Sequence, residues 1–201
     1  WDSLMVPLEK VDDDLGRVWG VVSHLHSVKN SQEIRDVYDS LLGEIVTFSN
    51  RMGQSKPLYN AYLTLRDGAE WDGYDKPKKR IIESSIREAE LNGVALDDDA
   101  RSRYNEISQR QAEISTKYSN NVLDDTKAFR IKLESPNEVE GLPSTLLELA
   151  ADEARRDGHD DASAKNGPWV ITLDIPSFMP FMQHSKQRAL RQKMYQAFGT
   201  K

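Results

Sequence analysis

Residues 96–133 constrain the fold most, because they predict a long amphipathic helix that leads into a short strand. The apolar residues of this stretch recur at spacings of three, four and seven, which place them on one side of an α-helix; they are Ala100, Tyr104, Ile107, Ile114, Tyr118 and Val122. The acidic residues 97–99 supply carboxylates where the free N–H groups and the positive dipole end of a helix lie. We therefore expect a helix to begin there.

A small β-ribbon is expected after this helix. Phe129, Ile131 and Leu133 alternate with charged residues, which is typical of a half-buried strand. The run WVITL at 169–173 is β-branched at its centre and is the best partner for the first strand. The sequence thus predicts a two-stranded ribbon around 128–134 and 169–173.

The rest of the chain predicts further helices, so the expected fold is mainly α, with antiparallel helical hairpins around the long central helix. Start and stop signals predict four helices before the central one. The first runs from Leu4 to Leu25 with Pro7 in its first turn, and the second is opened by a capping box of Asn30 and Glu33 and ends at Gly53. The third follows Pro57 and buries Leu58, Tyr62 and Leu65, and the fourth runs from Pro77 to Gly93 and buries Ile81, Ile82, Ile86 and Ala89.

After the central helix, the sequence predicts a helix between Pro143 and Gly158 and a polar surface loop over 157–168. A short turn over 176–182 and a last helix over 186–198 follow.

The first helix carries a narrow apolar seam with two interpretations. Its members alternate at spacings of four and three; they are Leu4, Leu8, Val11, Leu15, Val18, Val22 and Leu25. A seam of this kind packs either against other helices of the same chain or against a second copy in a coiled-coil dimer. Because only about three heptads are present, the intramolecular core is favoured.

Composition and charge exclude several classes of protein. No apolar run approaches the roughly 20 residues that a membrane-spanning helix needs, and the net charge of −6 argues against general binding to nucleic acid. The chain has no cysteine, which excludes disulfides and thiolate chemistry among these residues. The first residue lies inside a helical pattern and is not methionine, so we expect the chain to be one part of a larger protein.

The histidines do not predict a metal site. His24 and His26 are two residues apart, and on a helix this spacing points the rings away from each other. His159 and His184 stand alone, and no histidine is followed by the Glu-x-x-His that a zinc hydrolase carries on a helix. The predicted catalytic, cofactor-binding and metal-binding residues of this chain are therefore none.

The charged runs have simple structural interpretations. Residues 76–80 (KPKKR) are either a phosphate patch or nuclear signal, or the solvated start of a helix, and the position of Pro77 favours the helix start. The acidic runs 12–14 and 97–99 lack the alternating ligands and glycine of a calcium loop. We interpret them as charged helix faces and caps.

Four phrases carry a resemblance to a known family: VDDDLGRVWGVVSHLHSVKNS at 11–31, LRDG at 65–68, YSNNVLDDT at 118–126 and LDIPSFMPFM at 173–182. Together with the sequence between them, they resemble the amino-terminal part of the thimet oligopeptidase family of zinc metallopeptidases, over essentially the whole chain. More loosely, GPW at 167–169 and QHSKQRALR at 183–191 resemble plant members, which work in the cytosol, chloroplasts or mitochondria.

The resemblance implies a soluble, mostly helical peptidase that cleaves short peptides in a channel between two halves. Residues 1–201 would then be a non-catalytic helical wall that restricts substrate size, and the zinc ligands would lie beyond them. The implied partners are short peptides and the missing catalytic half of the same chain, without nucleic acid or membrane, and apolar faces left uncovered would favour self-association. The alternative is a stand-alone helical module that binds peptides or assembles with other proteins without catalysis.

Overall fold

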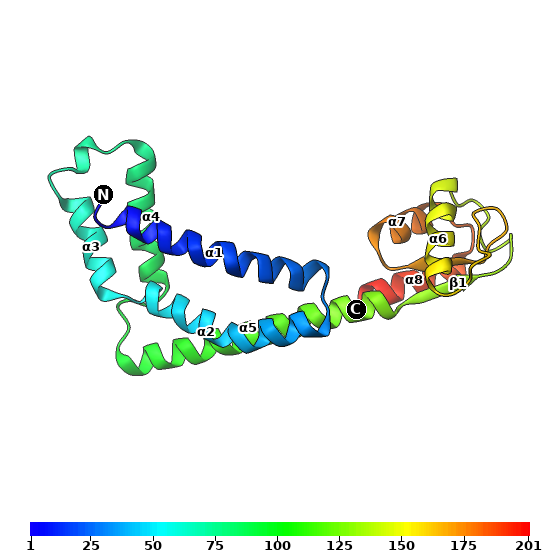
Figure 1. Cartoon of the computed structure of the whole chain (residues 1–201), viewed down its shortest axis with the longest axis horizontal. Helices are drawn as coiled ribbons and strands as arrows, with labels where there is room; N and C mark the ends of the chain where they lie inside the picture. The colour runs from blue at the N-terminus through cyan, green and yellow to red at the C-terminus, as the bar shows by residue number, and fades with distance from the viewer. The chain divides into compact units, whose positions relative to one another are not determined.

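The computed structural model describes residues 1–201 and confirms the predicted class, a mainly helical chain with one two-stranded sheet (Figure 1). In chain order the elements are α1 (Met5–Val28), α2 (Gln32–Gly53), α3 (Lys56–Asp67), the single 3₁₀ turn η1 (Trp71–Gly73), α4 (Lys76–Leu91), α5 (Asp98–Ala128), β1 (Arg130–Leu133), α6 (Ser144–Arg156), β2 (Trp169–Thr172), α7 (Ile175–His184) and α8 (Arg188–Thr200). The chain forms two compact units, unit 1 from Trp1 to Ile114 and unit 2 from Ser115 to Lys201. Helix α5 begins in unit 1 and ends in unit 2.

Unit 1 consists of antiparallel helices. In Figure 1, α1 and α2 form one hairpin, and α3 pairs with α4. Side-chain amides join α2 to the first half of α5: Gln109 Nε2 donates to the Gly43 carbonyl and to Thr47 Oγ1, each at 3.0 Å. Gln54 Nε2 donates to Asn105 Oδ1 at 2.9 Å. Polar side chains therefore connect these two helices.

The junction of α1 and α2 differs from the predicted capping box. Ser31, rather than Asn30, caps α2, and its hydroxyl accepts from the Ile34 N–H at 3.4 Å. Asn30 instead terminates α1 in the left-handed region, at φ +48°, and its N–H donates to the Leu25 carbonyl at 3.0 Å. Asparagine tolerates this conformation better than most residues, which is why it serves as a helix C-terminal residue here.

The predicted starts of α4 and α5 are confirmed, whereas the last helix begins at Arg188 rather than at Lys186. The Asp97 carboxylate accepts from the Ala100 N–H at 2.8 Å at the start of α5. Asp75 caps α4 in the same way through the Lys78 N–H, at 2.9 Å. Gly93 follows the end of α4 with φ +83°, where a side chain would be strained.

Unit 1 has a sparse core. Its buried apolar side chains are Ile82, Ile86, Ala89 and Val94. Helices α2, α3 and α5 bury no residue fully, so the side chains predicted inside α3 are only half-buried. In α1 the one buried residue is His26. The helices of this unit are therefore ordered mainly by half-buried contacts.

Several side chains predicted to face the core are exposed instead. Ile81 of α4 is 46% exposed. On α5, Ile107 and Ile114 are each 52% exposed and Tyr118 is 66% exposed. Periodicity identified one apolar face correctly, but this face is exposed from Ile107 to Tyr118, in the middle of α5, and half-buried toward the two ends.

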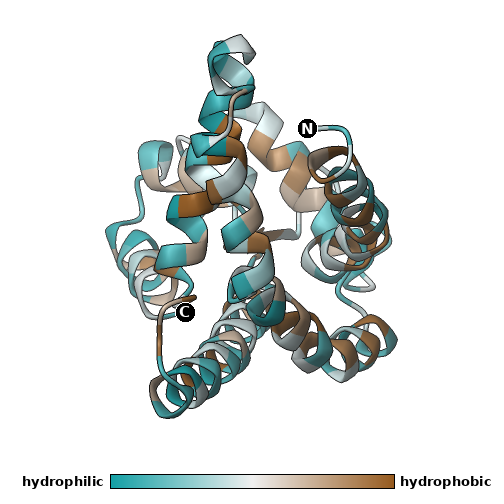
Figure 2. Cartoon of the chain, turned by 90° about the vertical axis from the view of Figure 1, so that its left-hand side faces the viewer, coloured by the Kyte–Doolittle hydropathy of each residue, from teal (hydrophilic) through white to brown (hydrophobic).

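The apolar seam of α1 packs intramolecularly only in part. Leu4, Leu8, Leu15 and Val22 are half-buried, whereas Val11, Val18 and Leu25 are exposed, joined by Val21 and Val28. Figure 2 shows brown, hydrophobic stretches on the helix that follows the labelled N-terminus. The helix is rotated so that Trp19 and His26 point inward, which leaves an outer apolar strip: Val11, Val18, Val21, Leu25 and Val28.

Unit 2 holds the dense core and confirms the predicted ribbon. Strands β1 and β2 are antiparallel, with Ile131 opposite Ile171 and Leu133 opposite Trp169. In β1 exposed and buried residues alternate as predicted, whereas every residue of β2 is buried. Helices α6, α7 and α8 complete the core with these side chains: Leu146, Ala150, Ala151, Phe178, Phe181 and Met194.

Two connections of unit 2 differ from the predictions. Residues 176–182 form helix α7 rather than a turn, because Pro176 occupies its first turn, where a missing N–H costs little, and Pro180 is accommodated inside. The predicted surface loop over 157–168 is partly internal: Ala162 is 4% exposed, and the Trp169 indole N–H donates to the Ala164 carbonyl at 3.1 Å.

Candidate functional site

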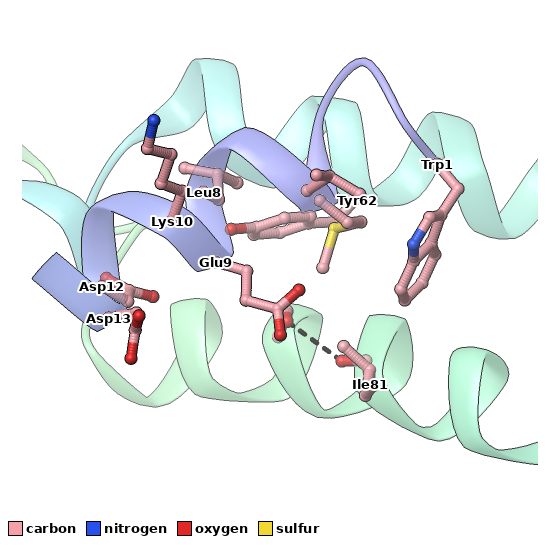
Figure 3. Close-up of a pocket in the computed structure, with 11 residues that line it drawn as sticks. Trp1, Leu8, Glu9, Lys10, Asp12, Asp13, Tyr62 and Ile81 are labelled. Carbon is pink, nitrogen blue, oxygen red and sulfur yellow. Dashed lines mark hydrogen bonds between the residues drawn. The ribbon is translucent and has the colours of Figure 1, made fainter.

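A cleft of about 890 Å³ lies in unit 1 between the first half of α1 and the α3–α4 pair (Figure 3). We call it the α1 cleft. Its apolar lining comes from all three helices and from Trp1, which lies four residues before α1 begins, and it includes Met5, Leu8, Tyr62 and Ile81. These side chains are half-buried or, in Ile81, exposed, so the lining remains open to a ligand. The volume falls in the range typical of small-molecule sites.

One side of the α1 cleft is acidic. Glu9, Asp12 and Asp13 of α1 contribute to the lining. Asp13 pairs with Arg17 at 2.5 Å, whereas Glu9 and Asp12 form no ion pair. Figure 3 shows Glu9 pointing toward Ile81 of α4, while Lys10, the basic residue of the lining, points the other way. The uncompensated charge at this side of the cleft is therefore negative.

Tyr62 places a hydrogen-bonding group beside these carboxylates. Burial raises the pKa of Tyr62, and the negative charges of Asp12 and Glu88 raise it further. The phenol consequently remains protonated at neutral pH, and its hydroxyl makes no hydrogen bond within the protein. It is available as a donor to a bound carbonyl oxygen.

Trp1 lies at the end of the cleft away from Asp12 (Figure 3), and it contacts aromatic and lysine side chains that are outside the lining. The rings of Trp1 and Tyr74 meet edge to face with centroids 6.1 Å apart, and the Lys78 ammonium lies 5.3 Å from the Trp1 ring centroid. The Lys79 ammonium lies 5.4 Å from the Trp71 ring. The predicted basic run is thus a helix start, as expected, and two of its lysines are held by cation–π contacts.

The two neighbouring histidines lie in different environments. His24 is exposed, whereas His26 is 7% exposed and stacks on Tyr38 with ring centroids 4.1 Å apart. Burial lowers the pKa of His26; Asp39 opposes this shift and Arg35 adds to it. The buried Nε2 atom of His26 has no protein hydrogen-bond partner. This ring therefore acts as a neutral packing group between α1 and α2.

The residues present do not fit a zinc ion. No three of the His, Cys, Asp and Glu side chains come together in a geometry that would hold a metal. Residues of the acidic runs form contacts within helices instead. Asp13 pairs with Arg17 in α1, Asp97 caps α5, and Asp98 pairs with Arg101 at 3.3 Å. None of the helices combines the length and apolar content that crossing a bilayer requires.

The arrangement provides groups that could contact a bound ligand. The α1 cleft offers an apolar surface, two unpaired carboxylates and a phenol. Sequence analysis did not predict this cleft. The available signal was that Glu9 and Asp12 are three residues apart and share a face of α1 with Met5 and Leu8, but only the packing of α3 and α4 places that face beside a cavity.

Comparisons with known proteins agree along the whole chain. A family model described as the N-terminal domain of neurolysin/thimet oligopeptidase matches residues 1–101. The chain is 46% identical, over 98% of its length, to the organellar oligopeptidase A of Arabidopsis thaliana, chloroplastic/mitochondrial, and 45% identical over the same share to a probable cytosolic oligopeptidase A of that plant. It is 38% identical over its full length to oligopeptidase A of Escherichia coli. It spans about a quarter of the length of these relatives, 25–28%.

Proposed function

Because the chain belongs to the neurolysin/thimet oligopeptidase family, we propose that it is the amino-terminal, non-catalytic region of a larger peptidase that hydrolyses short peptides. The observation that carries this proposal is the similarity to oligopeptidases A along the whole chain, from α1 through the β-ribbon to α8. The relatives are named as peptidases and are about four times as long. In this proposal residues 1–201 belong to one of the two halves of the enzyme and form about a quarter of its length.

The role of this region would be to form one wall of a substrate channel and to exclude folded proteins by size. The sparse core of unit 1 supports this role. Its long helices bury almost no side chains fully and leave apolar residues exposed on α1 and α5. Exposed apolar faces of this extent are typical of surfaces that another part of a protein covers.

Zinc and the compartment belong to the same proposal. The family implies a zinc ion, and since residues 1–201 offer no group that fits one, its ligands would lie outside this region. The plant relatives are named for organelles and for the cytosol. We accordingly place the protein in the cytosol, a chloroplast or a mitochondrion, with short peptides and the catalytic half as partners rather than nucleic acid or a membrane.

A chimera tests the proposal. Residues 1–201 would replace the matching quarter of the Arabidopsis organellar oligopeptidase A, and hydrolysis would be measured with quenched fluorescent peptides of increasing length and with a folded protein. We expect the chimera to cleave the short peptides and to leave the folded protein intact. The unsubstituted plant enzyme is the reference for the length limit.

A folded chimera that cleaves no peptide would contradict the proposal and would favour the alternative, a stand-alone binding module. Cleavage of the folded protein would contradict the size-limiting role alone. Circular dichroism and sedimentation of the chimera separate both outcomes from a failure to fold.

A further inference from the structure

We propose that the α1 cleft binds a peptide segment in which an apolar side chain lies next to an arginine or lysine. This goes beyond the proposed function, because peptide hydrolysis by a longer protein does not require this cleft. The proposal rests on three features of the cleft: its apolar lining, its uncompensated negative charge and its polarity from one end to the other.

The apolar lining selects for a hydrophobic side chain. Trp1, Leu8 and Tyr62 present ring and aliphatic surface from different elements to one cavity. None of these three side chains is fully buried in the chain itself. A leucine or phenylalanine side chain in the cleft would remove this surface from water together with its own.

The acidic side selects for a cation beside that apolar group. Glu9 and Asp12 are three residues apart on α1, so both carboxylates reach the same side of the cleft, and neither is neutralised by an ion pair. Asp12 also lies close enough to Tyr62 for its negative charge to raise the pKa of this phenol, which burial raises most. An arginine or lysine of the ligand would lie here, and the Tyr62 hydroxyl would donate to a backbone carbonyl of the ligand.

The opposite end fixes the direction of the ligand. Lys78 lies against Trp1 and Tyr74, at 5.3 and 5.9 Å from the ring centroids, and would repel a second cation. The positive group of the ligand therefore lies at the Glu9 and Asp12 side, and the apolar group lies toward Trp1. The carboxylates of α1 would repel an acidic peptide, so charge complementarity favours basic peptides over acidic ones.

The binding test uses ¹⁹F NMR of the full chain with 5-fluorotryptophan at its four tryptophans. A Trp1→Phe variant assigns the Trp1 signal. The probe is a synthetic peptide that alternates leucine and arginine, compared with one in which glutamate replaces arginine and one in which serine replaces leucine. We expect the leucine–arginine peptide to shift the Trp1 signal, and the other two to bind more weakly.

A matched pair of variants tests the site. Glu9→Gln with Asp12→Asn removes both carboxylates from an exposed helix face, and we expect the affinity to fall about tenfold. The control, Glu44→Gln with Glu148→Gln, removes the same charge from exposed positions outside the cleft and should bind as the original chain does.

Three results would overturn the inference: unchanged affinity in the cleft variant, equal binding of the glutamate peptide, or equal binding of the serine peptide. A shift confined to the other tryptophan signals would also overturn it, because the peptide would then bind elsewhere. The chimera assay and this binding assay fail independently, so a negative result here leaves the peptidase proposal unaffected.

Discussion

Tyr38 is expected to hold the α1–α2 hairpin together, because its ring is stacked from both sides. Its centroid lies 4.8 Å from the Trp19 ring at an interplanar angle of 21°, and 4.1 Å from the His26 ring at 18°. Neither α1 nor α2 has another fully buried side chain besides His26. Loss of this one ring should therefore affect the hairpin more than a half-buried tyrosine usually would.

The expected cost of Tyr38→Ala follows from these contacts. Two stacked pairs contribute about 0.5–1.5 kcal/mol each, and the lost burial of a half-exposed ring adds about 1 kcal/mol. We expect the free energy of opening the hairpin to fall by about 2–4 kcal/mol, which accelerates amide exchange in α1 and α2 about 30- to 700-fold. Exchange in β1 and β2, which belong to the other compact unit, should stay unchanged.

Hydrogen–deuterium exchange with mass spectrometry measures this effect peptide by peptide. Tyr38→Phe keeps the stacked ring, and Tyr195→Ala removes a tyrosine that is 69% exposed on α8; both should change stability by less than about 0.5 kcal/mol. If Tyr38→Ala left the protection of α1 and α2 within about threefold of the original, the stack would not be what holds the hairpin, and the reasoning would be refuted.

Three further predictions follow from burial and exposure. Folding lowers the pKa of His26 from 6.5, so the unfolded state binds a proton more readily than the folded state does. The free energy of unfolding should therefore be constant above that pH and decline as the pH falls below it. Urea unfolding measured from about pH 8 to about pH 5.5 should show a smaller decline in the His26→Phe variant. Leu133→Ala should cost about 2–5 kcal/mol in urea unfolding of unit 2, since Leu133 is 0% exposed; a cost below about 1 kcal/mol would contradict the burial. Residues 1–201 should self-associate in sedimentation velocity, and Val18→Ser with Val28→Ser should weaken this more than Tyr195→Ser does; a monomer at every concentration would refute the prediction.

Local sequence signals predicted elements that depend on neighbours in the chain. The Asp97 cap, the Gly93 termination and the alternation of β1 each use interactions within a few residues, so their physical cause is present in the sequence itself. At the α1–α2 junction the sequence contains two candidates for the N-cap of α2. Asn30 and Ser31 are both good caps, and only the three-dimensional turn assigned the left-handed position to Asn30.

Burial was predicted less well, because it depends on which surfaces meet. The periodic faces of α1 and α5 are apolar in sequence, yet Val18 and Ile114 are exposed, since no element of the chain covers them. Helix α7 formed through Pro180 because Phe178 and Phe181 bury their rings in the core of unit 2, which offsets the missing backbone hydrogen bond.

The sequence by itself determined the family, the helical class, the pairing of β1 with β2 and most helix boundaries, because these depend on residue identity and on short-range hydrogen bonds. Only the tertiary structure decided the α1 cleft. Glu9, Tyr62 and Ile81 are far apart in the chain, and they line one cavity because α1 packs along α2 while its first half lies open toward α3 and α4. A cavity is the space that packing leaves unfilled, and periodicity along one helix contains no information about it.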